Sequence, residues 1–273
     1  MRYETAAELA TLHGLPAPPQ YEYSDLAGFL AIYRDVCACM RTSDDFERVI
    51  LEHARSMHEQ GIAYSEISFN PDLHEGDEWI AGIERGREHA RHDFDVEIAW
   101  LVELVRGAPS SANERALDIA LATNGVVGLG LVGDEAAGSQ EIASLIDRAH
   151  AKGLRFMPHA GQTGGPEVVR EAIEVFDADR IAHGVTSLSD ESVLRLVAER
   201  GMCLCVCPSS NARIGLRPDY GAIASAGVPL TINSDDPAMV GTTLRHELER
   251  AERVYRLNHE QLIANAWEFA FRT

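Results

Sequence analysis

From residue 64 onward, short apolar runs alternate with longer segments whose apolar positions recur every three or four residues. The short runs are typical of β-strands and the longer segments of amphipathic helices. We predict strands at Tyr64–Phe69, Asp95–Leu101, Val126–Val132, Arg155–Pro158, Arg180–Ala182, Met202–Val206 and Val228–Ile232. We predict helices between them at Glu78–His92, Asn113–Thr123, Ser139–Lys152, Glu167–Phe176, Ser189–Arg200 and Asp219–Ala226. This alternation predicts parallel strands joined by helical crossovers.

Three further helical segments precede the first predicted strand, over residues 1–13, 24–41 and 44–60. The first ends at Gly14, after which a group of prolines prevents the helix from continuing. We expect Ser43 or Asp44 to cap the third segment and Gly61 to end it.

The number of strands leaves two folds open. A closed (β/α)8 barrel needs eight parallel strands, and seven are visible in this sequence. The chain is therefore either an open doubly wound sheet or a TIM barrel that lacks its first strand. No Gly-x-Gly-x-x-Gly motif follows the first strand, so a dinucleotide-binding fold is only weakly indicated.

Composition narrows the class of protein. With 273 residues, 45% of them hydrophobic, the chain can bury one large core, and we expect residues 1–273 to form a single domain. A net charge of −19 argues against a nucleic-acid binder, which would need a basic face. The sequence has neither a long apolar run nor a signal-peptide pattern, so we predict a cytoplasmic protein without a membrane span.

Cys203, Cys205 and Cys207 alternate along one predicted strand and so share a face. One interpretation is a thiolate metal cluster. We favour reduced thiols packed as small apolar side chains, because no Cys-x-x-Cys spacing occurs in the sequence.

Polar side chains that can bind a metal follow three of the predicted strands. His159 and Gln162 follow one strand, His183 follows the next, and Asp235 and Asp236 follow the last. Since the carboxyl ends of parallel strands form one face, these residues are expected to converge there. Imidazole and carboxylate ligands suit Zn²⁺ or a related ion and favour hydrolysis. Taken singly, each also fits a structural explanation, such as a packed histidine or a helix-capping turn.

The motifs at the strand ends, in this order and spacing, resemble the adenosine deaminase family of metal-dependent aminohydrolases over almost the whole chain. The motifs are Gly133-Asp134-Glu135, His159-Ala160-Gly161, the segment from Pro166 to Ala172, Arg180-Ile181-Ala182-His183-Gly184, the segment from Val206 to Asn211, and Ser234-Asp235-Asp236-Pro237. The resemblance implies a (β/α)8 barrel and hydrolytic removal of a purine 6-amino group as ammonia. The other zinc deaminase design carries His-x-Glu and Pro-Cys-x-x-Cys motifs, and neither occurs here.

The resemblance also implies roles for single residues. His159 and Asp235 would bind one Zn²⁺, and His183 would orient or deprotonate the attacking water. Asp236 would accept a hydrogen bond from the purine ring edge, and the backbone N–H of Gly133 would meet a ring nitrogen. The implied partner is a small purine nucleoside, with adenosine as the first substrate to test.

The sequence departs from the family at its start. The family opens with a His-x-His strand that supplies two further zinc ligands, and this sequence begins just past the place of that strand. We therefore expect two histidine ligands upstream of Met1 and a barrel domain that is incomplete at both ends. Because catalytic zinc usually has three protein ligands, we expect weak or no metal binding by the chain as it stands.

The second departure is Gln162, which stands where the family carries the glutamate that protonates ring N1. An amide has no carboxyl proton to give, and loss of a positioned general acid lowers rates by about 10²–10⁴-fold. Glu135 and Glu167 are nearby acids, but we expect Glu167 to face outward on the first turn of a helix. Three functions stay open: an adenosine deaminase, a deaminase of another aminopurine or modified nucleoside, and a catalytically impaired nucleoside-binding remnant.

Overall fold

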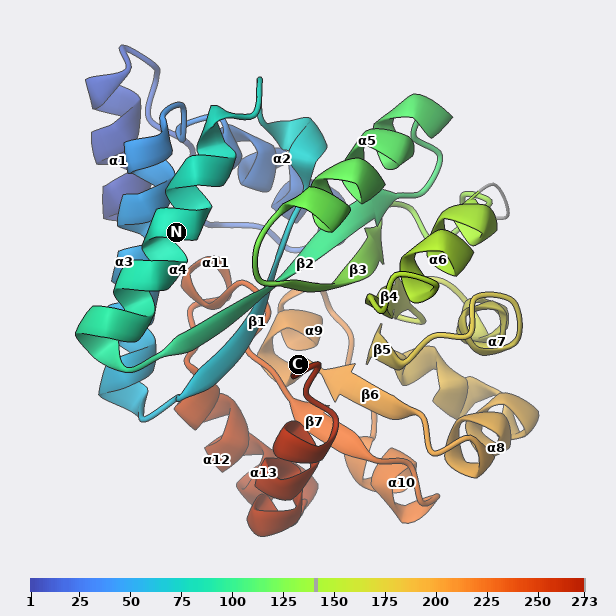
Figure 1. Cartoon of the computed structure of the whole chain (residues 1–273). Helices are drawn as coiled ribbons and strands as arrows, with labels where there is room; N and C mark the ends of the chain where they lie inside the picture. The colour runs from blue at the N-terminus through green and yellow to red at the C-terminus, as the bar shows by residue number, and fades with distance from the viewer. Residues whose placement is uncertain (140–141, 273) are drawn as a thin grey trace.

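The computed structural model of the protein describes residues 1–139 and 142–272. Its centre is one sheet of seven strands that curls round on itself (Figure 1). The strands are β1 Tyr64–Phe69, β2 Glu97–Val105, β3 Val126–Val132, β4 Arg155–Ala160, β5 Arg180–His183, β6 Cys203–Val206 and β7 Leu230–Ile232. All neighbours pair in parallel, and their order in the sheet is their order in the chain. This order lacks the reversal of a doubly wound sheet, so the prediction of an incomplete barrel is confirmed.

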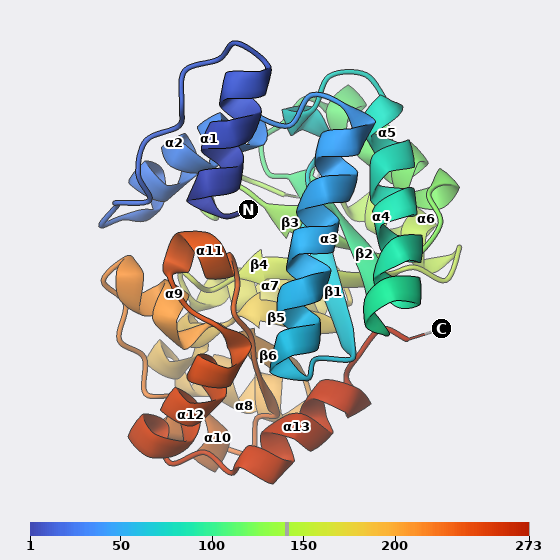
Figure 2. The ribbon, with the colours of Figure 1, turned by 90° about the vertical axis from the view of Figure 1, so that its left-hand side faces the viewer.

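Helices cover the outside of this sheet and also lie beyond its ends (Figures 1 and 2). They are α1 Tyr3–Leu12, α2 Leu26–Cys37, α3 Ser43–Gln60, α4 Glu78–Phe94, α5 Ser110–Ala122, α6 Ala143–His150, α7 Pro166–Glu174, α8 Glu191–Glu199, α9 Pro208–Arg213, α10 Tyr220–Ser225, α11 Pro237–Val240, α12 Leu244–Tyr255 and α13 His259–Glu268, with short 3-10 turns at Pro71–Leu73 and Val185–Ser189. Every predicted helix is present within a few residues of its expected bounds. The predicted Ser139–Lys152 helix includes residues 140–141, which lie outside the described residues.

Several predicted boundaries are wrong. The strand β2 continues to Val105 rather than ending at Leu101, and α2 ends at Cys37 rather than at residue 41. Two other differences have a local reason. The cap of α3 is Thr42 rather than Ser43 or Asp44: its hydroxyl accepts the Asp45 N–H, while the Asp45 carboxylate accepts the Thr42 N–H. The second strand begins at Glu97 rather than Asp95, because Asp95 ends α4 in the left-handed conformation with φ 55°. Gly61 ends α3 at φ 74°, as expected for a glycine cap.

Alternate residues along each strand face the inside of the sheet or the surrounding helices. Phe156 and Val206 belong to the main apolar cluster between sheet and helices, whereas the intervening positions of β4 and β6 face inward. Gly130 on β3 leaves room inside, since a Cβ there would come within 2.2 Å of a carboxylate oxygen of Glu103. The interior therefore accommodates charged side chains.

The sheet has two edges, at β1 and β7, and no strand of the described residues pairs with the outer side of either. The end of the chain lies beside β1 instead (Figures 1 and 2). The Phe271 N–H donates to Glu66 Oε1 at 2.6 Å, and the Phe271 ring packs 3.7 Å from the Arg180 guanidinium carbon. Arg180 also forms a buried ion pair with Glu66. These contacts link the end of the chain to β1 and β5.

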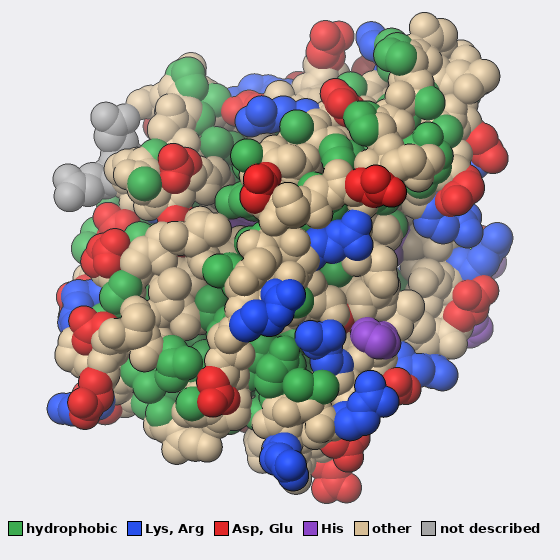
Figure 3. Space-filling model, turned by 180° about the vertical axis from the view of Figure 1, so that it is seen from behind, with side chains coloured by type: hydrophobic (Ala, Val, Ile, Leu, Met, Phe, Trp, Pro, Cys, Tyr) green, Lys and Arg blue, Asp and Glu red, His purple; other side chains and the backbone are tan. Residues whose placement is uncertain are grey.

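The surface carries charges of both signs. On the face shown in Figure 3, acidic and basic side chains are interspersed among polar and apolar groups. None of the described helices combines the length and the apolar character needed to cross a membrane. Cytoplasmic localisation stays a prediction.

Candidate active site

The predicted histidines meet at the carboxyl ends of adjacent strands. His159 lies near the end of β4, and His183 is the last residue of β5. Their ring centroids are 5.2 Å apart, with the planes inclined by 46°. The Nδ1 atoms of both rings are buried and have no hydrogen-bond partner among the described residues. Two adjacent imidazoles that each keep one unpartnered nitrogen can offer these nitrogens to a cation.

The backbone is strained at two of the predicted site residues. His183 has φ 66° and Asp235 has φ 56°, and both are side-chain-bearing residues in the left-handed region. Such a conformation costs about 1–3 kcal/mol and persists only where the surrounding structure imposes it. Here it orients both side chains at the end of the sheet.

A compact group of possible ligands includes a residue that the sequence interpretation assigned to strand packing. One ligand atom each from His183, Cys207 and Asp235 lie within 4.8 Å of one another. His159 is outside this group but lies beside His183. Cys207 follows directly after β6, the same kind of position that singled out the histidines. That position is the signal that sequence reasoning could have used. All five cysteines are free and buried, as expected.

Opposing electrostatic effects set the charges of this group. Burial lowers the pKa of His183 to about 4, against the attraction of Asp235, so the imidazole is neutral at pH 7. Burial acts to raise the pKa of Asp235, but His183, a hydrogen bond from Ser210 and His159 together hold it below its usual value. Asp235 is itself exposed, whereas His183 and Cys207 beside it are buried. A neutral imidazole beside a carboxylate is a suitable pair of metal ligands.

Asp236 is not the helix cap that its sequence position suggested as an alternative. It stands at the N-cap of α11, but its side chain makes no capping hydrogen bond. Burial, followed by the neighbouring charge of Asp235, raises the pKa of Asp236 to about 8. Without a cation, Asp236 therefore holds a proton at pH 7 and can donate a hydrogen bond. A cation bound to Asp235 would lower the pKa of Asp236 by offsetting the adjacent negative charge.

Gln162 is fixed by a chain of buried polar groups. Its Nε2 donates to Asn211 Oδ1 at 3.0 Å, and Asn211 Nδ2 donates to the Tyr220 hydroxyl at 2.9 Å. Asn211 is fully buried, and it also lies beside His183. The amide of Gln162 therefore has a defined place next to the histidines.

The segment after β3 supplies the other predicted contact, Gly133. Its φ of 105° suits glycine, and a Cβ there would lie 3.3 Å from the Arg106 backbone nitrogen. Two residues on, the buried carboxylate of Glu135 accepts hydrogen bonds from backbone N–H groups of the segment that follows His159. Because both of its carboxylate oxygens already accept backbone hydrogen bonds, Glu135 is not available to replace Gln162 as the proton donor. Glu167 is exposed on the first turn of α7, as expected.

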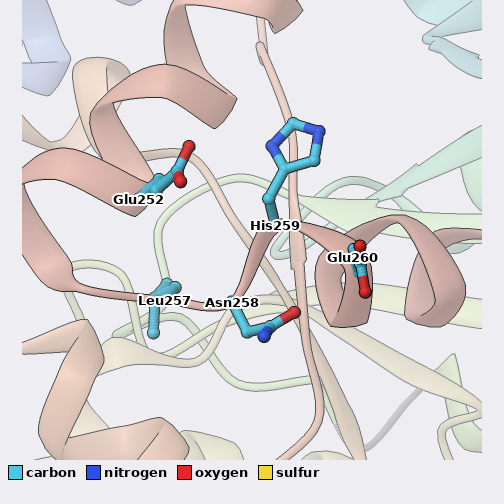
Figure 4. A pocket seen from close by; sticks show the side chains of 5 residues that line it. All are labelled: Glu252, Leu257, Asn258, His259 and Glu260. Atoms are coloured by element: carbon cyan, nitrogen blue, oxygen red, sulfur yellow. The ribbon is translucent and has the colours of Figure 1, made fainter.

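One surface hollow lies apart from these residues. It has a volume of about 550 Å³ and lies where α12 meets α13 (Figure 4). Its lining residues are Glu252, Leu257, Asn258, His259 and Glu260. None of them belongs to the strand-end cluster, so the hollow is not part of the candidate site.

Curated proteins with known activities are similar to this chain over nearly all its length. It is 35% identical over 280 residues to the aminodeoxyfutalosine deaminase of Streptomyces coelicolor, covering 94% of this chain and 72% of that protein. It is 31% identical over 292 residues to the adenine deaminase of Rhodospirillum rubrum, covering 98% of this chain and 87% of that protein.

Solved structures show the same fold. The adenine deaminase of Arthrobacter aurescens superposes with a TM-score of 0.93 at 24% identity, covering 100% of this chain and 90% of that one. An amidohydrolase from Burkholderia ambifaria with bound Zn gives a TM-score of 0.87 at 20% identity, covering 100% of this chain and 83% of that one.

The family model named Adenosine deaminase matches residues 17–271, which is most of the chain. This match, the curated relatives and the strand-end residues agree on one class of enzyme, the hydrolases that act on amidine-type C–N bonds. The chain therefore belongs to the adenosine deaminase family.

Proposed function

We propose that this protein removes the exocyclic amino group of an aminopurine by metal-dependent hydrolysis. The observation that carries the proposal is the convergence of His159, His183 and Asp235 at one end of the sheet, with unpartnered imidazole nitrogens. The named activities of the relatives support an aminopurine, since they include adenine and aminodeoxyfutalosine deaminases. Adenine is the first substrate to test, followed by aminodeoxyfutalosine and adenosine.

The residues present fit a divalent cation, and we propose Zn²⁺. His159 and Asp235 would hold it, and the neutral His183 beside them has a free nitrogen lone pair. Zn²⁺ would supply the Lewis acid that such hydrolyses need. Cys207, whose sulfur is in the compact group, is a further possible ligand.

The other roles concern the protein's own groups. His183, neutral at pH 7, would accept a proton from the attacking water. Asp236 and the Gly133 N–H would bind the ring edge and so fix the carbon under attack. Gln162 would hold the ring nitrogen by a hydrogen bond without giving it a proton. Slow turnover is the consequence.

The test is ammonia release from adenine, aminodeoxyfutalosine and adenosine by the zinc-loaded protein. The Gln162→Glu variant should raise the rate by about 10²-fold, because a carboxylic acid can protonate the ring. Gln261→Glu is the matched control, since Gln261 likewise donates its Nε2 to an asparagine, Asn265, at 2.7 Å, but lies on α13. No ammonia release by either the wild type or Gln162→Glu would contradict the proposal.

A second candidate function, purine binding without catalysis, is favoured by one observation, the glutamine at position 162. If the site binds purines without turning them over, hypoxanthine and adenine should bind with similar affinity and no ammonia should appear. Calorimetric titration of both ligands decides between the two functions. Binding without turnover in the wild type, restored to catalysis by Gln162→Glu, identifies the loss of the acid as the cause.

A further inference from the structure

Glu135 makes an unusual set of contacts for a residue so close to the site. Its side chain is 7% exposed and lies two residues after Gly133. Oε2 accepts the N–H of Gly161 at 2.6 Å and of Gly164 at 3.2 Å. Oε1 accepts the N–H of Gln162 at 3.0 Å and of Thr163 at 3.3 Å. One carboxylate therefore binds four successive backbone amides.

Successive N–H groups that converge on one point form a nest, which prefers a negative charge. Here the anion is an internal carboxylate rather than a ligand. Glycine makes the approach possible, because a Cβ at Gly164 would lie 2.8 Å from the Glu135 Cβ, and Gly161 has φ 73°. Hydrogen bonds to a charged acceptor are stronger than neutral ones.

The same region is held from a second side. The buried guanidinium of Arg106 donates to the backbone oxygen of His159 at 2.9 Å and lies 3.9 Å from Glu171. Glu171 in turn accepts a hydrogen bond from Ser139 at 2.7 Å. Arg106 therefore fixes the backbone at His159, two residues before the nest, and Glu135 fixes the nest itself.

We propose that Glu135 is a positioning residue that sets the distance between the two groups proposed to bind nitrogens of the purine ring, the Gly133 N–H and the Gln162 amide. The inference rests on the proposed function for the identity of the ligand. The hydrogen bonds between Glu135 and the amides of residues 161–164 are independent of that function. Glu135 and Gly133 lie in one turn, in which Asp134 Oδ1 accepts the Ala136 N–H at 3.0 Å. Gln162 lies inside the nest, so moving the nest moves Gln162 relative to Gly133.

The experiment uses the full chain and compares Glu135→Gln with wild type by NMR-detected amide exchange. An amide side chain carries one acceptor oxygen and two donors, so it cannot serve four N–H groups. We expect the amides of residues 161–164 to exchange about tenfold faster or more, a change of about 1.4 kcal/mol. The amide of Leu131 on β3 should keep its protection. Glu167→Gln, the same change at an exposed position close in sequence, should leave all five amides unchanged.

A functional readout separates positioning from simple stability. In the zinc-loaded enzyme, Glu135→Gln should lower kcat by about tenfold or more with a smaller change in KM, because misplacement weakens interactions made in the transition state. Glu135→Asp, which keeps the charge on a shorter side chain, should recover part of both the exchange protection and kcat.

Three results would overturn the inference. They are unchanged exchange at residues 161–164 in Glu135→Gln, equal loss of protection at Leu131, and equal effects of Glu135→Gln and Glu167→Gln. If Glu135→Gln does not fold, Glu135→Asp decides by the same criteria. If the wild type releases no ammonia, the proposed function fails, while the exchange data still decide whether Glu135 holds the nest.

Discussion

Two buried glutamates lie near His159, and their surroundings differ. Glu135, after β3, has both oxygens bonded to backbone amides. Glu103, on β2 inside the sheet, is 4% exposed, and its Oε2 has no partner among the described residues. Burial raises the pKa of Glu103, against the nearby His159 and a hydrogen bond from Ser68. The first carboxylate stabilises a loop, whereas the second costs free energy when ionised.

The difference shows where this fold contains unpaired polar groups. The four amides of residues 161–164 and the carbonyl of His159 are hydrogen-bonded, so the backbone positions of His159 and Gln162 are well determined. The unpartnered atoms Glu103 Oε2, His159 Nδ1 and His183 Nδ1 lie on the inner side and at the end of the same sheet. Unpaired polar groups in such a place are expected at a site that binds a charged ligand.

The largest effect should come from removing the bonded carboxylate. Glu135→Ala leaves four backbone N–H groups without their acceptor, and we expect a loss of about 3 kcal/mol in the free energy of unfolding. That loss corresponds to a fall of about 6–12 °C in Tm. Urea unfolding followed by circular dichroism measures it, with Glu167→Ala as control. A loss below about 0.5 kcal/mol would remove the contrast between the two glutamates.

An intermediate effect should appear in the pH dependence of stability. The raised pKa of Asp236, about 8, means that the folded state holds a proton that the unfolded chain releases near pH 4. The contribution of protonated Asp236 to the free energy of unfolding is therefore present at low pH and is lost as the pH rises to about 8. The lowered pKa of His183, about 4, has the opposite effect, but only below about pH 6.5.

Between about pH 6.5 and 8, the contribution of Asp236 should therefore fall as pH rises, whereas Cys205, whose pKa a hydrogen bond from Cys203 lowers to about 6, contributes in the opposite direction. Relative to the wild type, Asp236→Asn should lack the downward slope that Asp236 contributes, because its side chain does not titrate. Asp147→Asn, at an exposed position on α6, is the control and should keep it. Urea unfolding at four pH values across this range measures the slope. A slope that survives in Asp236→Asn would assign it to another group.

The smallest effect should have the opposite sign to the first. Glu103→Gln replaces a carboxylate that burial destabilises with a neutral amide of the same size, so Tm at pH 8 should rise by about 2 °C. Differential scanning calorimetry of the metal-free protein detects such a change. A fall in Tm as large as that of Glu135→Ala would show that Glu103 is also a bonded, stabilising carboxylate.

The sequence pattern predicted the alternating strands and helices, and the family resemblance selected the barrel from the two folds that the pattern left open. Apolar runs gave the bounds of β1 and β3, and strand-end positions identified His159, His183 and Asp235 as neighbours. The short helices α9 and α11 were missed because each has only a few residues and begins at a proline that resembles a turn. The longer helix α12 was not predicted either. The domain count stays a prediction.

Residues that act through distant contacts could not be found in this way. Glu135 is bonded to amides 26 to 29 residues further along the chain, and its sequence context is only an acidic turn. Cys207 is a different case: its position directly after β6 could have marked it, but its place among buried cysteines favoured packing as the interpretation. The contacts of Glu135 follow from tertiary structure rather than from any local pattern.

The central claim is that side chains from separate strand and helix units hold one cation at the end of the sheet. Anomalous scattering at the zinc edge, from crystals of the full chain grown with excess Zn²⁺, tests it most directly. The account predicts a peak within about 2 to 2.5 Å of ligand atoms of His159 and Asp235, with His183 adjacent. A His159 ring and an Asp235 carboxylate that lie more than about 8 Å apart, or zinc bound only elsewhere, would contradict it.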